Sequence, residues 1–339
     1  MSASLRRFAD QGVANSPPVD DPDIPTLGTV LNPKELGKQL KLVSSSEWWR
    51  ALREVRIQVL EWRSAKRCTF EIALRTDLIG KVYAKDRPNV YQVMETLTRA
   101  GFGPEADFSI PQPIAYVSSL RLLLQEKVEG IPAKLIFRRG DERQRAAAAE
   151  RCAQWLARFH ALAPPPGQVL DVEGILRRTE RKSRLVSEEG GALAAKSAQL
   201  FGRLKAAASS LGRIPMCPGH GDYTPYQVIL AEGRTVVYDW DLYVVADPTR
   251  DVAKFMVSLA RQALHRLGSI RVLDGAAEGF LKTYLASGGH SQVAARLPFY
   301  KAIFCLSGAN RDVLTKAPDW RDRAEAMLDE GLRTIDRRE

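Results

Sequence analysis

The chain has 339 residues, of which 45% are hydrophobic and 27% charged, a composition that fits a globular protein large enough for two lobes or domains. No apolar run approaches the roughly 18 residues of a membrane span, and the N-terminal segment lacks the apolar centre of a signal peptide, so we expect a soluble, cytoplasmic protein with no membrane partner. The formal net charge of +10 favours anionic ligands, but acidic residues interrupt each basic run and no aromatic residues are interleaved with them, so we expect no nucleic-acid partner.

The first third of the chain has the pattern of a small α+β lobe. Residues 1–30 are rich in Pro, Ser, Gly and Asp, which predicts a disordered tail. A helix is predicted over residues 44–57, "SSSEWWRALREVRI". Partial alternation then predicts strands in "VLEWRSAKRCTFEIALRT", "DLIGKVYAK", "PIAYVSS" and "LRLLLQEKVEG", with the helix "PNVYQVMETLTRAGFG" among them. We therefore predict an N-lobe over residues 31–128 that contains an antiparallel sheet.

Helical periodicity dominates the rest of the chain. The segment "RQRAAAAERCAQWLARFHAL" is rich in alanine and has apolar residues at helical spacing, and further helices are predicted on both sides of residues 220–251. That stretch interrupts the helices with short strands. We predict a mainly helical C-lobe over residues 129–339, and a cleft between two such lobes is a common location for a ligand site.

The stretch "HGDYTPYQVILAEGRTVVYDWDLYVVADPTRD" carries five aspartates in a partly apolar context. A carboxylate at Asp222, on a loop, could accept a proton from a substrate hydroxyl. A hairpin turning at residues 232–233 would bring Asp239 beside Gln227. A carboxylate and an amide oxygen, completed by phosphate oxygens and water, suit Mg²⁺. A base and metal ligands on adjoining loops are what phosphoryl transfer requires.

Three segments, "HGDYTPYQVIL", "VVYDWD" and "DPTRDVAKF", resemble the catalytic core of the aminoglycoside phosphotransferase and choline kinase-like family. The family pattern is His-Gly-Asp, four residues, Asn, then an apolar strand ending in Asp-Trp/Phe-Asp/Glu, then Gly-Asp-Pro. The resemblance covers about residues 50–330 and is strongest over residues 217–256. It implies an α+β fold class: a two-lobed protein-kinase-like fold with a small β-rich N-lobe that binds a nucleotide and a larger, mainly helical C-lobe.

The resemblance also implies roles for individual residues. Asp222 matches the catalytic aspartate and Asp239 the metal-binding aspartate. Gln227 occupies the position of the metal-binding asparagine; its extra methylene moves the amide, but the donor oxygen remains, and the similar maltokinases carry Gln there. Ala246 replaces the usual glycine in a structural turn.

Four other residues near this core have alternative interpretations. Asp241 could be a second metal ligand or an exposed acid. We expect His220 to orient the catalytic loop through hydrogen bonds rather than to act as a base. Asp251 is expected to cap the helix that follows it, or, if it is buried near His220, to brace the catalytic loop. His160 is expected to be a core or interlobe contact.

The nucleotide-binding residues of the N-lobe are also implied by the resemblance. A kinase-like fold holds the α- and β-phosphates with a lysine on a strand. Lys81 and Lys85 are an even number of residues apart, so both are expected on the same face of the strand, and Lys81 is preferred. Glu95 is the candidate helix partner of that lysine, with an exposed surface position as the alternative. The segment that resembles the interlobe linker would bind the adenine edge through backbone groups of four residues: Gln125, Glu126, Lys127 and Val128.

The predicted function is therefore ATP- and Mg²⁺-dependent phosphorylation of a hydroxyl on a small molecule of the aminoglycoside, amino alcohol or sugar type. The partners would be ATP and that substrate, and the oligomeric state is not determined by the sequence. Substrate choice should come from the helices after Asp251, with Tyr300 and Trp320 as candidate contacts. The alternative is a nucleotide-binding pseudokinase that acts as a regulator or adaptor. A third hypothesis, a basic nucleic-acid binder, rests on charge alone.

Overall fold

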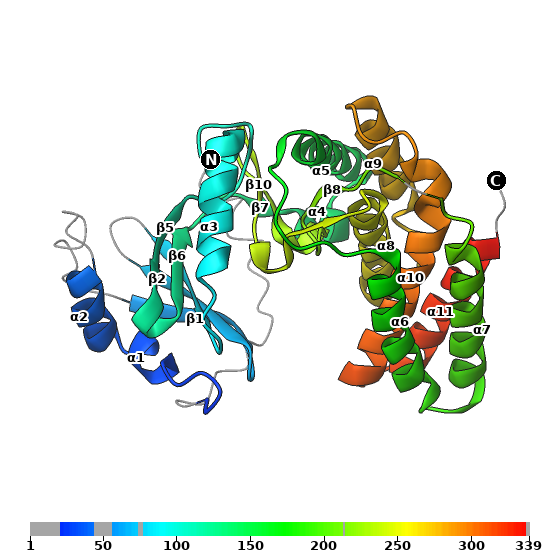
Figure 1. Ribbon diagram of the computed structural model, residues 1–339, viewed down its shortest axis with the longest axis horizontal. Coiled ribbons are helices and arrows are strands. Elements are labelled where there is room, and N and C mark those ends of the chain that lie inside the picture. Colours follow the sequence, from blue (N-terminus) through cyan, green and yellow to red (C-terminus); the bar gives the residue numbers. More distant parts are fainter. Residues whose placement is uncertain (1–20, 44–55, 74–76, 213, 337–339) are drawn as a thin grey trace. The chain divides into compact units, whose positions relative to one another are not determined.

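The computed structural model describes residues 21–43, 56–73, 77–212 and 214–336, and these fall into two compact units, Met1–Glu129 and Gly130–Glu339. Figure 1 shows strands concentrated in the first unit and helices in the second. Together the two units confirm the predicted α+β fold class, with a sheet in the N-terminal part and a mainly helical C-terminal part.

A five-stranded antiparallel sheet forms the centre of the first unit, in the order β1-β2-β3-β6-β5. Its strands are β1 (Arg56–Arg63), β2 (Arg67–Ala73), β3 (Leu78–Tyr83), β5 (Pro113–Val117) and β6 (Leu122–Glu126). The helix α3 (Pro88–Leu97) packs against β5 and continues into η3 (Thr98–Phe102), and the short strand β4 (Phe108–Ser109) follows. The helix and most of the strands predicted for this region are therefore present.

One glycine fixes how β2 and β3 approach each other. Gly80 lies opposite Phe70 in the β2–β3 register, and a Cβ placed on Gly80 would lie 2.6 Å from the Phe70 ring. The Phe70 ring therefore covers the backbone of β3 at this position, and a side chain on residue 80 would displace it. The neighbouring residue, Lys81, points to the opposite face of the same strand.

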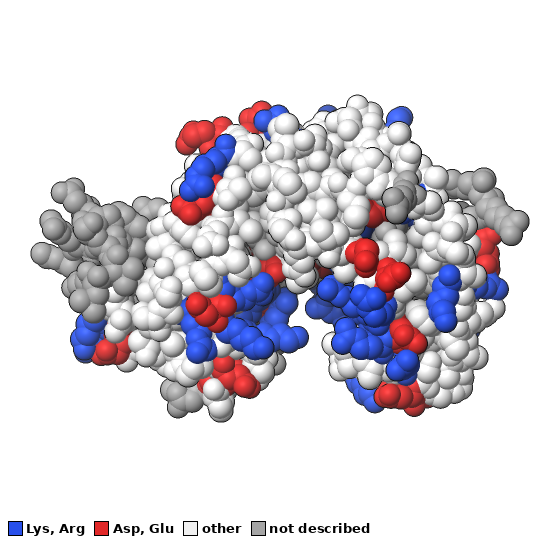
Figure 2. All heavy atoms as spheres, in the orientation of Figure 1, with Lys and Arg blue, Asp and Glu red and all other residues white. Residues whose placement is uncertain are grey.

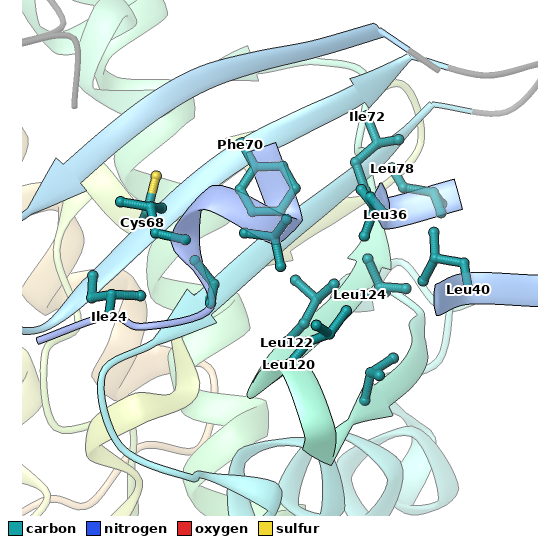
Figure 3. Packing of buried hydrophobic residues seen from close by; sticks show 14 residues of the cluster. Ile24, Leu36, Leu40, Cys68, Phe70, Ile72, Leu78, Leu120, Leu122 and Leu124 are labelled. Carbon is teal, nitrogen blue, oxygen red and sulfur yellow. The ribbon is translucent and has the colours of Figure 1, made fainter. Parts of the chain in front are cut away.

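Residues 21–31 contribute to the core of this unit, so the disorder predicted over residues 1–30 is wrong for residues 21–30. Residues 1–20 lie outside the described part of the chain, but α1 (Leu27–Leu31) and α2 (Pro33–Val43) are helical. Ile24 and Leu27 are buried in the hydrophobic cluster of the sheet together with Phe70 and Leu122 (Figure 3). The Pro- and Asp-rich composition suggested a loose segment, but its few apolar residues are spaced to reach one core.

The turn between β1 and β2 is held by this same segment. The Asp21 carboxylate accepts hydrogen bonds from the indole of Trp62, at 3.1 Å, and from the backbone N–H of Ala65, at 3.3 Å. Ala65 has a positive φ of 58°, in the left-handed region, which is uncommon for a residue other than glycine. The predicted helix over residues 44–57 falls mostly outside the described residues, and the two of its residues that are described, 56 and 57, belong to β1.

The second unit is built mainly from helices. They are α4 (Ala133–Arg139), α5 (Glu142–Leu162), α6 (Val172–Ser187), α7 (Gly191–Ala208), α8 (Thr249–Arg266), α9 (Asp274–Ala286), α10 (Val293–Thr315) and α11 (Trp320–Asp336). The long helix α10 packs against α6, α7, α8 and α11, and α5 packs against α9 (Figure 1). The helix α5 begins at a capping box, in which the Asp141 side chain accepts from the Gln144 backbone N–H and the Gln144 side chain accepts from the Asp141 backbone N–H. None of the described helices combines the length and the apolar composition that crossing a bilayer requires.

Short strands interrupt the helices of this unit as the sequence predicted. The hairpin β9 (Val228–Leu230) and β10 (Thr235–Val237) is antiparallel, and β7 (Ile131–Pro132) pairs with β9. A second small sheet joins β8 (Cys217–Gly219) to β11 (Val244–Ala246). The loops that leave these strands carry the aspartates of interest.

A cluster of buried aromatic rings supports the loops. Trp155 and Phe159 of α5 stack on each other with ring centroids 5.0 Å apart, and Trp240 lies 5.4 Å from Phe159. Tyr223, which follows Asp222 directly, stacks on Trp155 and donates a hydrogen bond to the backbone of α5. Because both loops insert a large ring into one rigid core, their polar residues are held in fixed positions.

Candidate active site

The loop that carries Asp222 begins where β8 ends and passes directly over the loop after β10. Gly221 has a φ of +84°, and a Cβ placed on it would lie 2.1 Å from the carbonyl oxygen of Leu242. Only glycine fits this approach without displacing backbone atoms. The two loops are therefore in backbone contact beside Asp222.

Asp251, in the first turn of α8, holds the Asp222 loop from beneath. Its carboxylate is fully buried and accepts backbone hydrogen bonds from His220, at 2.6 Å, and from Gly221, at 3.1 Å. Burial acts to raise the pKa of Asp251, but the neighbouring His160 and Arg250 side chains outweigh it and lower the pKa below its ordinary value. The carboxylate is therefore charged, and it braces the loop that carries Asp222.

This arrangement corrects the expectation that Asp251 caps α8. The N-cap residue of α8 is Pro248, and the Asp247 carboxylate before it accepts from the Thr249 backbone N–H at 2.9 Å and forms a buried ion pair with Arg296 at 2.7 Å. His160, expected to be a core or interlobe contact, is buried inside the second unit, with Nε2 3.6 Å from the Asp251 carboxylate. His160 thus belongs to the support of the loop.

His220 joins the Asp222 loop to the end of β10. Its Nδ1 accepts from the Asp222 backbone N–H at 3.2 Å, and its Nε2 lies 3.0 Å from the carbonyl oxygen of Tyr238. A carbonyl only accepts, so Nε2 carries the proton and the imidazole is neutral. With both nitrogens engaged, His220 is a positioning residue, as the sequence predicted, and it ties together the backbones that precede Asp222 and Asp239.

The β9–β10 hairpin forms as predicted, and the two candidate metal ligands lie at its open end, Gln227 directly before β9 and Asp239 two residues after β10. The Tyr238 backbone N–H donates to the Gln227 carbonyl at 3.1 Å, so Gln227 lies opposite the residue before Asp239. Asp239 is partly exposed and has a φ of 74° in the left-handed region. Trp240, buried among the aromatic rings, separates Asp239 from Asp241 and anchors both.

The donor atoms of this hairpin fit a hard cation. Gln227 offers an amide oxygen, which accepts a hydrogen bond from the hydroxyl of Thr224, and Asp239 offers a carboxylate. In the described part of the chain no three His, Cys, Asp or Glu side chains cluster as an all-protein metal site. Mg²⁺ does not need such a cage, because it is commonly bound through one or two protein oxygens, substrate phosphates and water.

Sequence reasoning missed the basic residues around Asp222. Lys254, one turn after Asp251 on α8, lies 3.1 Å from the Asp222 carboxylate, and both side chains are partly exposed. Lys182 of α6 is also close enough for Asp222 to influence its pKa. Lys254 could have been suspected because it shares a helix face with Arg250, four residues earlier. Lys182 could not, because α6 precedes the loop by about 40 residues.

In the first unit, Lys81 lies on β3 and is buried, with its Nζ 5.2 Å from the centre of the Tyr83 ring. Lys85 was expected on the same face of the strand, but β3 ends at Tyr83 and Lys85 is exposed in the bend that follows, which corrects that expectation. Glu95 lies on α3 as predicted and forms an ion pair with Arg99 at 3.5 Å, on the exposed side of the helix. Its partnership with Lys81 stays a prediction.

The predicted linker segment leaves the sheet after Glu126. Gln125 and Glu126 belong to β6, and the Glu126 backbone N–H donates to Gln112 at 2.9 Å. The Lys127 ammonium pairs with Glu71 at 2.9 Å and with two other acids, Asp77 and Glu129. The Lys127 side chain therefore has a structural role in this unit, and the proposed adenine contact of residues 125–128 would use the backbone, as predicted.

Residues 58–295, more than half of the chain, match the family model described as "Phosphotransferase enzyme family". A comparison with curated protein sequences found no match.

Solved structures with a similar fold include three kinases. The aminoglycoside phosphotransferase APH(4)-Ia has a TM-score of 0.61 and 15% identity, and the match covers 88% of this chain and 98% of that one. The choline kinase LicA from Streptococcus pneumoniae has a TM-score of 0.58 and 14% identity, over 90% and 99% of the two chains. A choline/ethanolamine kinase family protein from Mesorhizobium loti has a TM-score of 0.58 and 13% identity, over 91% and 96%.

At these identities the structural similarity establishes a protein-kinase-like fold, and it leaves the substrate open. The family match covers both units, including the β8–β11 region that carries Asp222 and Asp239. The chain therefore belongs to the phosphotransferase enzyme family.

Proposed function

We propose that this protein transfers the γ-phosphoryl group of ATP, with Mg²⁺, to a hydroxyl group of a small molecule. The observation that carries the proposal is the pair of contacts made by His220, which join the backbone before Asp222 to the backbone before Asp239. A candidate base and a candidate metal ligand thus arise from two loops that the fold fixes against each other.

Each residue of the site has a role in this proposal. Asp222 orients the acceptor hydroxyl and takes its proton as the oxygen attacks the γ-phosphorus and ADP leaves. Gln227 and Asp239 hold Mg²⁺, with Asp241 as a further candidate ligand. When bound, the ion neutralises charge on the β- and γ-phosphate oxygens.

Three other features support the transfer. Lys81 contacts the α- and β-phosphates, and the backbone of residues 125–128 binds the adenine edge. Asp251 keeps the Asp222 loop in place, because its buried charge accepts two backbone hydrogen bonds from that loop. Positioning of this kind accounts for most of the catalysis of phosphoryl transfer.

Measurement of ADP release with a panel of hydroxyl compounds tests the proposal. We expect Asp222→Asn to lower kcat by about 100-fold or more, in line with the loss of a general base, while ATP binding is kept. Asp241→Asn serves as a comparison that separates an exposed acid from a metal ligand, because only a metal ligand would change the Mg²⁺ requirement. Binding of ATP without any turnover, unchanged by Asp222→Asn, would support the pseudokinase alternative instead.

A further inference from the structure

Two helices of the second unit, α6 and α8, carry basic residues near Asp222. Arg178 and Lys182 are four residues apart on α6, and Arg250 and Lys254 are four residues apart on α8, so each pair lies on one helix face. These four residues are called the cationic cluster below. Figure 2 shows basic side chains gathered on the second unit in the region of α6.

Side-chain contacts connect the cluster to the Asp222 loop and to α10. Lys254 Nζ lies 3.1 Å from the Asp222 carboxylate and 5.0 Å from the centre of the Phe304 ring. The guanidinium of Arg250 lies 5.9 Å from the same ring. Lys182 Nζ donates to the hydroxyl of Ser307 at 2.9 Å, one turn after Phe304 on α10. The cluster therefore surrounds one side of Asp222.

The positive charge of the cluster is only partly compensated. Lys254 lies beside Asp222, and Arg250 interacts with Asp251. The nearby acids of α6 pair with other arginines, Glu173 with Arg177 and Glu180 with Arg184. Within the described ranges, no carboxylate forms an ion pair with Arg178 or Lys182.

Two partly buried side chains of the cluster, Arg250 and Lys182, show the same excess of positive charge. The buried Nη1 of Arg250 has no hydrogen-bond acceptor among the described residues. Burial, followed by the charges of Lys254, Arg250 and Arg178, lowers the pKa of Lys182 to about 8. Like charges held together in a partly buried place repel one another, and an anion between them would relieve this repulsion.

We propose that the acceptor carries an anionic group, a phosphate or a carboxylate, which the cationic cluster binds while Asp222 engages the acceptor hydroxyl. The proposal rests on the proposed kinase function and names the substrate class of the same site. A sugar phosphate or a sugar acid has this chemistry. A cationic acceptor, such as an amino alcohol or an aminoglycoside, would be repelled by the four charges.

The packing of the second unit assigns the cluster to the acceptor rather than to ATP. The oxygens that would hold Mg²⁺ on the phosphates of ATP come from the β9–β10 hairpin, which packs against α4, α5 and β7. The cluster comes from α6 and α8, which α10 joins. Asp222 lies where the two sets of elements meet, as the residue that receives the acceptor proton must.

Acceptor residues expected from the sequence are revised by this arrangement. Tyr300, predicted to contact substrate, is fully buried, and burial raises the pKa of its hydroxyl well above the ordinary value. Trp320, the other candidate, lies at the start of α11 between Lys316 and Arg321. The α10 residues that contact the cluster are Phe304 and Ser307, one and two turns after Tyr300.

A matched panel of acceptors tests the proposal. Glucose, glucose 6-phosphate, glucuronate, glucosamine and choline, together with other sugars in the same four charge states, would be assayed by coupled detection of ADP. We expect the phosphate- or carboxylate-bearing members to have a kcat/KM at least 10-fold above that of their neutral and cationic counterparts. The two anionic arms distinguish a phosphate from a carboxylate. Preference for neutral or cationic acceptors would overturn the inference and leave the kinase function standing.

Two variants of α6 locate the effect. Lys182→Gln is expected to raise the KM for the anionic acceptor about 10-fold and to leave the KM for ATP unchanged. Arg184→Gln, a change of the same kind at an exposed residue that pairs with Glu180, is the control and should change neither. A rise in the KM for ATP in Lys182→Gln would assign the cluster to the nucleotide and overturn the inference.

Equilibrium binding provides a readout that does not depend on turnover. Titration calorimetry with glucose 6-phosphate and with glucuronate, without nucleotide or Mg²⁺, should show binding that weakens at least 10-fold in Lys182→Gln and not in Arg184→Gln. Binding that is equal in the two variants, or absent in the wild type, would refute an anionic acceptor site. If the wild type binds these anions but releases no ADP with any acceptor, the proposed function alone would be refuted.

Discussion

The Asp251 carboxylate makes the strongest prediction about how this site is held together. Asp251→Ala removes a buried acceptor and leaves the backbone N–H groups of His220 and Gly221 without a partner. Hydrogen bonds to a charged group contribute about 1.5–3 kcal/mol each, so we expect a loss of roughly 3–6 kcal/mol for the two of them. In a unit of this size, 1 kcal/mol corresponds to about 2–4 °C in Tm, which predicts a fall of at least roughly 6 °C.

The assay is thermal unfolding of Asp251→Ala, Asp251→Asn and a control. Asp141→Ala removes an exposed N-cap carboxylate that accepts one backbone N–H at 2.8 Å, and it should cost only about 1 kcal/mol. Asp251→Asn keeps one acceptor oxygen but turns an NH₂ group toward the second backbone N–H, so its Tm should lie between the other two. Because Asp222 would move with the loop, kcat should fall about 10- to 100-fold in Asp251→Asn.

The pH dependence of stability gives an independent check. The folded pKa of Asp251 lies below its ordinary value, so its contribution to stability is complete above about pH 4 and is lost as the pH falls through the folded pKa. Asp251→Asn should therefore reduce the acid sensitivity of the wild type. A Tm of Asp251→Ala within 2 °C of wild type would refute the reasoning, since leaving two buried N–H groups without an acceptor must lower the stability by more than that.

Three further predictions concern other parts of the chain. Gly221→Ala places a Cβ against the carbonyl oxygen of Leu242 at a φ of +84°, so it should lower both stability, by about 2 kcal/mol or more, and kcat; equal Tm and kcat would contradict the backbone contact. Leu27→Ala should lower Tm of the first unit by an amount equivalent to about 2–5 kcal/mol, because Leu27 is fully buried, and an unchanged Tm would mean that residues 21–31 do not dock. Lys182→Met should raise stability at pH 7, because the pKa of Lys182 is lowered to about 8 in the folded protein and the wild type therefore gains stability only as the pH rises from about 8 to 10.5. Urea unfolding at pH 7 and at pH 9.5 measures this difference. A loss of stability in Lys182→Met at pH 7 would show that the hydrogen bond of Lys182 to Ser307 outweighs the repulsion.

The sequence predicted the β9–β10 hairpin and its consequence correctly. Alternating apolar residues around a Glu-Gly turn indicate a hairpin from local information alone, and the register then places Gln227 opposite Tyr238, the residue before Asp239. The role of His220 was also accessible, because a histidine two residues before a loop aspartate can bond to that residue's backbone.

Other expectations failed for identifiable reasons. Composition predicted disorder over residues 1–30, but Ile24 and Leu27 are buried because their spacing matches a surface of the distant sheet. Lys81 and Lys85 are an even number of residues apart and were expected on one face of a strand. The strand ends at Tyr83, and the alternation of side chains between faces does not continue beyond it. The capping role of Asp251 was preferred because helix starts favour aspartate, whereas burial and two loop N–H groups decided its contacts.

The sequence by itself determined the fold class, the hairpin and the candidate identities of the base and metal ligands, because these follow from local periodicity and from short motifs whose residues are close along the chain. Only the tertiary structure decided which charges surround Asp222. Lys182 and Lys254 lie about 40 and 30 residues from it in opposite directions, and they meet it only because α6 and α8 both pack on α10. Charge at a site is a sum over neighbours in space, and no pattern along one chain segment records that sum.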